Sequence, residues 1–308
     1  MNNNNKDNEE GKNQDNNFLE KIWVSLHLSL ERDLLEDYPL GPPGSDSNSG
    51  QLNSPSPNLN EKVVEQEGSE DSSCDDSCVE KSLADKHHSM MKEFKRIILA
   101  YGESTRFYHN TEHLCNVFQA FSIVPSVVHS HGVSGNTIGV KNSGSNNKKS
   151  KFNFSNISPI LGFAVFYHDM VYDATSPPAQ NEKESAKESL RYLNHLLAGR
   201  DHDLSDHVSQ MILSTIDHKP HLNSPEEKYF LDADLSILGA TEYIYFQAAA
   251  NIRKEYAHFN DEDFNRGRSA VLQKFLERDT IYYSSIFQSK CEQQARTNIK
   301  KEILKLSV

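Results

Sequence analysis

The sequence has no long apolar run, few cysteines and no cluster of basic residues. No stretch of about 18 apolar residues occurs, so neither a membrane-spanning helix nor a membrane partner is expected. The start of the chain lacks the apolar core of a secretory signal. A nucleic-acid partner is not expected either, because no Lys/Arg run stands out. The four cysteines are too few and too scattered for a disulfide framework, which favours a reducing, cytoplasmic location: Cys74, Cys78, Cys115 and Cys291.

Hydrophobic residues make up only 36% of the 308 residues, and three polar tracts account for this low share. Residues 1–17 are rich in Asn, residues 41–80 end in an acidic block, and Gly, Ser, Asn and Lys dominate residues 125–156. Such tracts cannot bury enough apolar surface to offset the entropy lost on ordering. We therefore expect a disordered tail at 1–17 and a single domain over 18–308 that carries two low-complexity insertions, at 41–80 and 125–156.

The pattern between these tracts is helical. Leu19, Trp23, Leu26, Leu30 and Leu34 recur at three- and four-residue steps, which places them on one face of a helix. No run of strictly alternating apolar residues indicates a strand. The sequence therefore predicts an all-α bundle with helices at 18–38, 87–102, 111–124, 157–173, 181–199, 203–217, 225–238, 241–258, 261–278 and 289–306. The helix at 157–173 is nearly all apolar and should be central and buried.

Several His and Asp residues lie within or beside the most apolar of these helices. His109 and His113 are four residues apart, and the pair His168-Asp169 lies near the end of the segment FAVFYHDMVYD. Two further acids, Asp232 and Asp234, lie in LDADLSILG. A carboxylate among apolar neighbours is costly unless it is paired or holds a metal. Imidazoles and carboxylates together suit a divalent cation such as Mn, Fe, Zn, Co or Mg.

The order of these residues resembles the HD superfamily of metal-dependent phosphohydrolases. The blocks RFYHNTEH, FYHDMVYD, NEKESA, LDADLSILGA, IRKEY and GRSAVLQKFLERDTIYY are similar, in this order, to those of an uncharacterised branch of that superfamily. The resemblance covers about residues 85–305, apart from the insertion. It implies an all-α fold around a metal held by His113, His168, Asp169 and a final Asp. Asp234 fits the final position better than Asp232, which is the alternative.

A more distant resemblance, to cyclic-nucleotide phosphodiesterases, rests on YHNxxH followed by His-Asp and a later Asp. It implies that His109 is the general acid that protonates the leaving oxygen. The structural alternative is that His109 is a core histidine that forms a hydrogen bond to a backbone carbonyl. Those enzymes have a further His after the His-Asp pair that serves a second metal, whereas this chain has Tyr172 there. His218, His221 or Glu182 could supply the ligands for a second metal instead.

Three other residues are catalytic candidates, each with a structural alternative. Asp173 lies four residues after Asp169, so one helix face could present both, and it could be a general base or a helix cap. Glu182 could orient a water, or favour the N-terminus of its helix through its charge. His218 could reach the active site, or complement the negative end of a helix dipole.

The candidates for substrate binding are four cations and one aromatic residue. Arginine in particular forms bidentate contacts to phosphate, although a surface salt bridge is the ordinary role of each cation taken singly. Arg106 is the strongest candidate because it is adjacent to the His pair. The full set is Arg106, Tyr108, Lys219, Arg253 and Arg268.

These observations predict a metal-dependent phosphohydrolase that hydrolyses a small-molecule phosphate ester, most plausibly a nucleotide, with a metal-activated water. The nucleotide comes from the resemblance alone. Two alternatives stay open: a di-iron oxygenase of the HD type, which needs additional metal ligands, and a ligand-binding HD protein without catalysis. The sequence does not set the oligomeric state.

Overall fold

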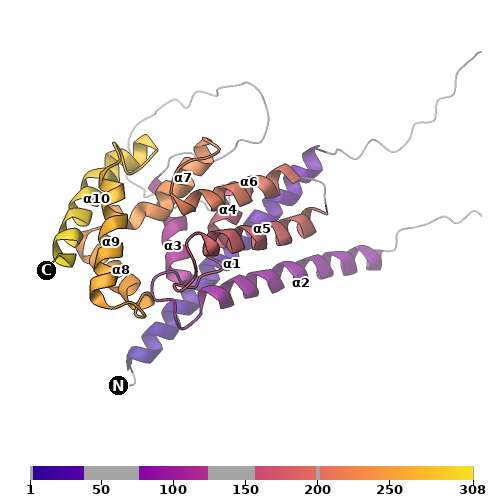
Figure 1. The fold of residues 1–308 in the computed structure, drawn as a ribbon. Coiled ribbons are helices and arrows are strands. Elements are labelled where there is room, and N and C mark those ends of the chain that lie inside the picture. The colour runs from indigo at the N-terminus through magenta and orange to yellow at the C-terminus, as the bar shows by residue number, and fades with distance from the viewer. Residues whose placement is uncertain (1–2, 38–75, 124–156, 199–201, 308) are drawn as a thin grey trace, which may run out of the picture.

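The computed structural model describes residues 3–37, 76–123, 157–198 and 202–307, and these are helical with no strand (Figure 1). The all-α prediction is confirmed. The α-helices within these ranges are α1 (Asn3–Asp37), α2 (Asp76–Tyr101), α3 (Thr111–Ala120), α4 (Pro159–Tyr167), α5 (Gln180–Leu197), α6 (His202–Leu213), α7 (Pro225–Asp234), α8 (Glu242–Glu255), α9 (Asp261–Leu276) and α10 (Ser285–Leu306). Short 3-10 helices follow α3, α6 and α7: η1 (Phe121–Ile123), η3 (Ser214–Ile216) and η4 (Leu235–Gly239).

The expected boundaries need two corrections near the N-terminal helices. Helix α1 starts at Asn3, so residues 3–17 are helical and not the disordered tail that their composition predicts. Once the buried part of the helix has formed, each further residue adds to it at little cost in free energy. Residues 11–14 are helical in this way although their side chains are exposed. Helix α2 likewise starts at Asp76, inside the expected insertion at 41–80. The rest of that insertion, and the one at 125–156, lie outside the described residues.

Helix α4 is the central buried helix, as its sequence predicts. Ser158 caps its N-terminus by accepting a hydrogen bond from the Leu161 N–H, and Pro159 occupies its first turn. All nine of its residues are buried, and it packs against α1, α3, α5, α6 and α7. A Cβ at Gly162 would lie 2.4 Å from the Leu26 side chain, so glycine permits the close approach of α1 and α4. Helix α4 ends at Tyr167, six residues before the predicted end at 173.

The apolar face of α1 packs on α4 through an aromatic cluster. The ring of Trp23 lies 5.5 Å from Phe163 and 5.0 Å from Phe166, both at edge-to-face angles. His27 is buried beside it, with Nδ1 donating to the Trp23 carbonyl and Nε2 accepting from the Tyr192 hydroxyl. The side chain of the fifth predicted face residue, Leu34, is outside the described part of the chain. Burial of the other four agrees with the predicted face.

The last three helices complete the molecule. Figure 1 shows α8, α9 and α10 together at one end, beside α3 and α7. Helix α10 packs against η4 and α9, and buried apolar side chains from α1 to α10 belong to one cluster. None of the helices in the described ranges has the length and apolar character needed to cross a membrane.

Candidate metal centre

Four side chains converge where α3, α4 and α7 meet, and they are the four predicted metal ligands. The Nε2 atoms of His113 and His168 are 3.1 Å apart. The Asp234 Oδ1 lies 3.3 Å and 3.6 Å from them, and the Asp169 Oδ2 lies 3.7 Å and 3.1 Å from them. Ligand atoms about 2.1 Å from one divalent cation are separated by roughly 3.0–3.4 Å in octahedral or tetrahedral geometry. The distances of 3.1 Å and 3.3 Å fall in this range, whereas those of 3.6 Å and 3.7 Å exceed it. His113, His168 and Asp234 form the group that could hold one cation, and Asp169 lies beside it.

Local structure fixes each of these ligands. Asn110 caps α3 through its side chain, which accepts from the His113 N–H and sets the first turn that carries the imidazole. His168 directly follows α4, and its Nδ1–H donates to the Val165 carbonyl at 2.8 Å. In the neutral ring this bond leaves the Nε2 lone pair directed at the cluster. Both imidazoles are almost fully buried, which limits the access of bulk solvent to these atoms.

The backbone of Asp169 is held at both of its polar groups. Its N–H donates to the hydroxyl of Tyr101 at 3.1 Å, and its carbonyl accepts from the Arg106 guanidinium. Arg106 also donates to the Met170 carbonyl at 2.8 Å and forms an ion pair with Glu103. The buried guanidinium of Arg106 therefore fastens the loop that presents Asp169. It does not line the cavity, where sequence reasoning placed it as a phosphate ligand.

The donor set fits a divalent cation electrostatically. Burial lowers the pKa of His168, but the carboxylates of Asp169 and Asp234 outweigh burial and raise it well above 6.5. Burial raises the pKa of Asp234, but hydrogen bonds from His113, His168 and His218 lower it well below 3.8. The two carboxylates thus stabilise positive charge between them. A cation bound by neutral imidazoles supplies that charge and uses the facing lone pairs.

The structure separates the two acids that sequence reasoning left as alternatives. Asp234 lies within the cluster, whereas Asp232 faces the start of α10. The carboxylate of Asp232 accepts from the Tyr283 N–H, the Ser284 N–H and the Ser284 hydroxyl at 2.6–2.7 Å. Asp232 therefore anchors α10, and Asp234 is the residue in position to bind a metal.

His218 approaches the same cluster from the turn after η3. Its Nε2 lies 3.2 Å from the Asp234 Oδ2, the oxygen that does not face the two ligand imidazoles. Its backbone is left-handed, with φ 48°. That conformation is stabilised because Tyr283 and Arg278 donate to its carbonyl at 2.8 Å and 3.0 Å. His218 thus orients Asp234, and its side chain is 27% exposed toward the cavity.

A buried carboxylate fixes His109 beside the cluster. The Glu255 Oε2 lies 2.7 Å from the His109 Nδ1, and because a carboxylate only accepts, Nδ1 carries the proton. The other oxygen of Glu255 accepts from the N–H groups of Tyr108 and His109. Tyr172 donates to Glu255 and stacks on the His109 ring at 4.2 Å. The rings of His109 and His113 are 5.8 Å apart, although His109 precedes α3 and shares no helix face with His113.

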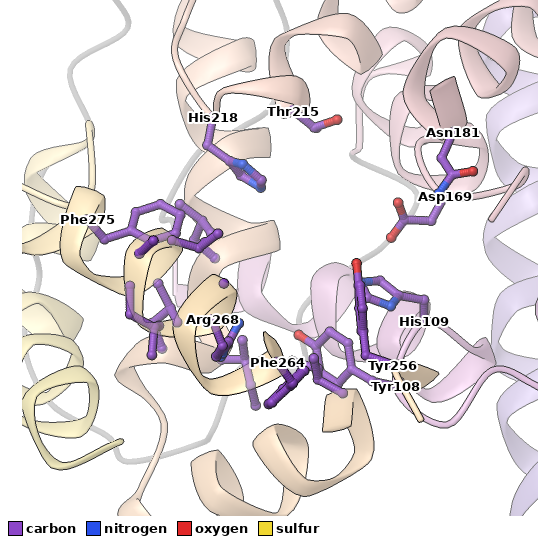
Figure 2. Close-up of a pocket in the computed structure, with 18 of the residues that line it drawn as sticks. Tyr108, His109, Asp169, Asn181, Thr215, His218, Tyr256, Phe264, Arg268 and Phe275 are labelled. Atoms are coloured by element: carbon purple, nitrogen blue, oxygen red, sulfur yellow. The ribbon is translucent and has the colours of Figure 1, made fainter. Parts of the chain in front are cut away.

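A cavity of about 1010 Å³ opens beside the metal centre (Figure 2). Asp169 and Asp234 line it, while His113 and His168 lie behind them. Five sequence-predicted site residues line the cavity in addition to these two acids: Tyr108, His109, Glu182, His218 and Arg268. Tyr172, which stands where a second-metal histidine would be expected, lines it as well. Figure 2 shows His109 and Asp169 on one side, with Arg268 and Phe275 across from them.

The expectation that Asp173 shares a helix face with Asp169 is wrong. Because α4 ends at Tyr167, neither residue is helical. Asp173 is exposed, and its carboxylate accepts from the backbone N–H and the hydroxyl of Thr175 at 2.8 Å and 2.7 Å. These hydrogen bonds lower its pKa. Asp173 therefore caps a turn, and not the end of a helix as in the structural alternative.

Two further cations and one histidine also lie away from the described lining of the cavity. Arg253 donates to the carbonyls of Tyr256 and Phe259 and pairs with Asp261. Lys219 is exposed near Asp217, and the His221 Nε2 lies 3.1 Å from the same carboxylate. The structure therefore directs His221 away from the cluster. Glu182 and His218 are the second-metal candidates that line the cavity.

Sequence reasoning missed Glu255 as the partner of His109. Glu255 lies in the block IRKEY. In sequence it is an acid at the end of a helix next to aromatic residues, a pattern that is common on protein surfaces and does not indicate a buried partner of His109. The burial of Glu255 depends on contacts with residues 146 and 147 positions away in the chain. Comparison with known proteins finds no matching family model, curated protein or solved structure.

Proposed function

We propose that this protein is a metal-dependent phosphohydrolase. The observation that supports it best is the convergence of His113, His168, Asp169 and Asp234 at the wall of a cavity that also contains the His109–Glu255 pair. In octahedral geometry, a cation held by two imidazoles and two carboxylates keeps coordination positions open. An acid–base histidine next to such a site is the arrangement that hydrolysis of a phosphate ester requires.

Each residue has a role in this proposal. A bound divalent cation supplies Lewis acidity, which lowers the pKa of water and offsets charge on phosphoryl oxygens. The four ligands hold that cation, and His218 keeps Asp234 oriented. The Nδ1 of His109 is occupied by Glu255, so its Nε2 is the atom available to donate a proton to the leaving oxygen. Glu255 balances the charge of the ring when both of its nitrogens are protonated.

The test is hydrolysis of p-nitrophenyl phosphate and bis(p-nitrophenyl) phosphate by the full chain. Mn, Mg, Co, Fe and Zn are supplied in turn after chelation. We expect hydrolysis with at least one metal, and its loss in Asp169→Asn and Asp234→Asn. Asp217→Asn is the matched control, because it removes an acid that contacts His221 outside the cluster. This control should keep full activity.

Two results would contradict the proposal. One is stoichiometric metal binding by the folded chain without hydrolysis of either ester under any of the five metals. The other is equal hydrolysis in the wild type and in both ligand variants, which would assign the activity to a contaminant. Metal content and circular dichroism are measured on every preparation, so that a loss of activity is not confused with a loss of fold.

A further inference from the structure

The wall of the cavity opposite the metal centre is apolar. It is formed by η4, α8 and α9, and its side chains include Leu238, Ile252, Phe264, Val271, Leu272 and Phe275. At the rim, Ile216, Phe259 and Val271 are 41%, 44% and 47% exposed. Large apolar side chains left uncovered around a cavity mark a surface that a ligand covers.

Two phenylalanine rings in this wall are held in fixed positions. Phe264 lies between the guanidinium of Arg253, 4.7 Å from the ring centre, and the ring of Tyr256, at 6.1 Å. Phe275 lies between Arg278, also at 4.7 Å, and the His218 ring, at 5.9 Å. Both side chains are buried, so their rings give the cavity a fixed apolar surface that loses little entropy when a ligand binds.

The charge of the side chains that line the cavity limits how many phosphate groups a bound substrate can carry. The two cations of this lining among the described residues are paired, Arg266 with Asp263 and Arg268 with the buried Glu302. Asp169, Asp234 and Glu182 add three negative charges to the cavity, of which two belong to the metal ligands. One divalent cation therefore leaves no surplus of positive charge. A chain of phosphates needs several unpaired cations around it.

We propose that the substrate carries one phosphoryl group joined to a large, uncharged, aromatic group, with the phosphoryl group at the metal and the aromatic group against the apolar wall that contains Phe264 and Phe275. This inference rests on the proposed function, whose site it extends. A cavity of about 1010 Å³ holds such a molecule, since pockets for drug-sized ligands measure roughly 300–1,000 Å³. Arg268, neutralised by Glu302, offers directional hydrogen-bond donors to that group and not net charge.

The experiment uses phosphonates, which bind as phosphate esters do and are not hydrolysed. Calorimetry measures the affinity of the metal-loaded chain for 1-naphthylphosphonate, octylphosphonate and methylphosphonate. We expect the naphthyl compound to bind at least 10-fold more tightly than the methyl compound, and more tightly than the octyl compound. Inorganic triphosphate, supplied as its magnesium complex, should bind more weakly than the naphthyl compound.

Phe264→Leu and Phe275→Leu keep the wall apolar but remove its aromatic rings. Each should reduce the preference for naphthyl over octyl at least 3-fold. Tyr243→Leu is the control, since Tyr243 is a 73% exposed aromatic residue on α8 outside this cavity. Equal affinity for all three phosphonates, or tighter binding of triphosphate, would overturn the inference.

The readout separates this inference from the proposed function. A chain that hydrolyses p-nitrophenyl phosphate but binds methyl- and naphthylphosphonate equally is a phosphohydrolase without the proposed aromatic specificity. A chain that prefers naphthylphosphonate but hydrolyses no ester has the ligand class inferred here and lacks the catalytic function. Binding is measured without turnover, so neither result depends on the other.

Discussion

The carboxylate of Glu255, at the C-terminus of α8, lies 2.7 Å from the Nδ1 of His109, which precedes α3. Burial raises the pKa of Glu255, but the hydrogen bonds from His109 and Tyr108 outweigh burial and lower it. Glu255 therefore stays ionised and accepts on both oxygens. This hydrogen bond links α8 to the segment that lies beside the candidate metal ligands. In the proposed mechanism His109, the histidine of this pair, is the proton donor.

His109→Ala separates metal binding from catalysis. His109 is outside the four-residue cluster, so the variant should bind the divalent cation with unchanged stoichiometry. Its turnover should fall by roughly 10²–10⁴-fold, which is the usual contribution of one general acid. The loss should be smaller for p-nitrophenyl phosphate than for an alkyl phosphate, because a good leaving group needs less protonation. Loss of the metal would make His109 a ligand, and unchanged turnover on the alkyl ester would exclude the general-acid role.

Glu255→Gln tests whether the carboxylate positions and supports His109. The amide keeps the shape but not the negative charge that stabilises a doubly protonated ring. We expect kcat to fall by about 10–100-fold, the usual effect of removing a group that supports an active residue. The alkaline limb of the pH–rate profile should move to lower pH. Tyr172→Phe, which keeps the stacked ring and removes one hydrogen bond to Glu255, should have the smaller effect. An unshifted profile in Glu255→Gln would leave Glu255 with a purely structural role.

Arg106→Lys tests the observed role of this guanidinium against the predicted one. Arg106 reaches the Glu103 carboxylate and the carbonyls of Asp169 and Met170 with three different nitrogens. A lysine carries all its donors on one nitrogen and cannot span these separated acceptors. The affinity for metal should therefore fall by about 10–100-fold, while KM at saturating metal changes little. Metal titration by calorimetry measures the first quantity and steady-state kinetics the second. Arg191→Lys, at a half-exposed ion pair, is the control. A large rise in KM with unchanged metal affinity would restore Arg106 as a phosphate ligand.

The all-α class and the proximity of His113, His168, Asp169 and Asp234 agree with what the sequence predicted, for different physical reasons. Apolar periodicity predicts α1 because burial of Trp23 and its neighbours determines which face points inward. The position of Asp234 followed from motif similarity, since periodicity alone does not distinguish it from Asp232. Only the tertiary structure shows that Asp232 binds the backbone at the start of α10, which is 51 residues further along the chain.

The sequence does not show which hydrogen-bond partner a polar side chain takes when partners nearby in the chain and partners far along it are both available. Asp173 was expected on a helix face because the apolar run continues to Val171, yet α4 ends at Tyr167. Arg106 and Arg253 were candidates for phosphate binding, with a salt bridge as the ordinary alternative. In the structure both form ion pairs and donate to backbone carbonyls of nearby loops. Composition cannot reveal such pairings, because they depend on which loops the fold brings together.

His27 should make the stability of the fold depend on pH independently of the metal centre. It is buried between Trp23 and Tyr192, and burial lowers its pKa from 6.5 to about 4 despite the hydrogen bond to the Trp23 carbonyl. The unfolded chain therefore binds a proton at a higher pH than the folded chain does. The stability due to neutral His27 is fully present above pH 6.5 and falls as the pH decreases toward about 4, by about 3 kcal/mol in total.

The measurement compares urea unfolding of the wild type and of His27→Gln, whose side chain stays neutral at every pH. We expect the unfolding free energy of the wild type relative to this variant to fall between pH 6.5 and pH 4, since only the wild type gains a proton on unfolding in that range. His87→Gln, at an exposed position of α2, should follow the wild type throughout. Parallel curves for the wild type and His27→Gln would show that His27 titrates alike in both states. That result would contradict burial of a neutral ring between α1 and α5.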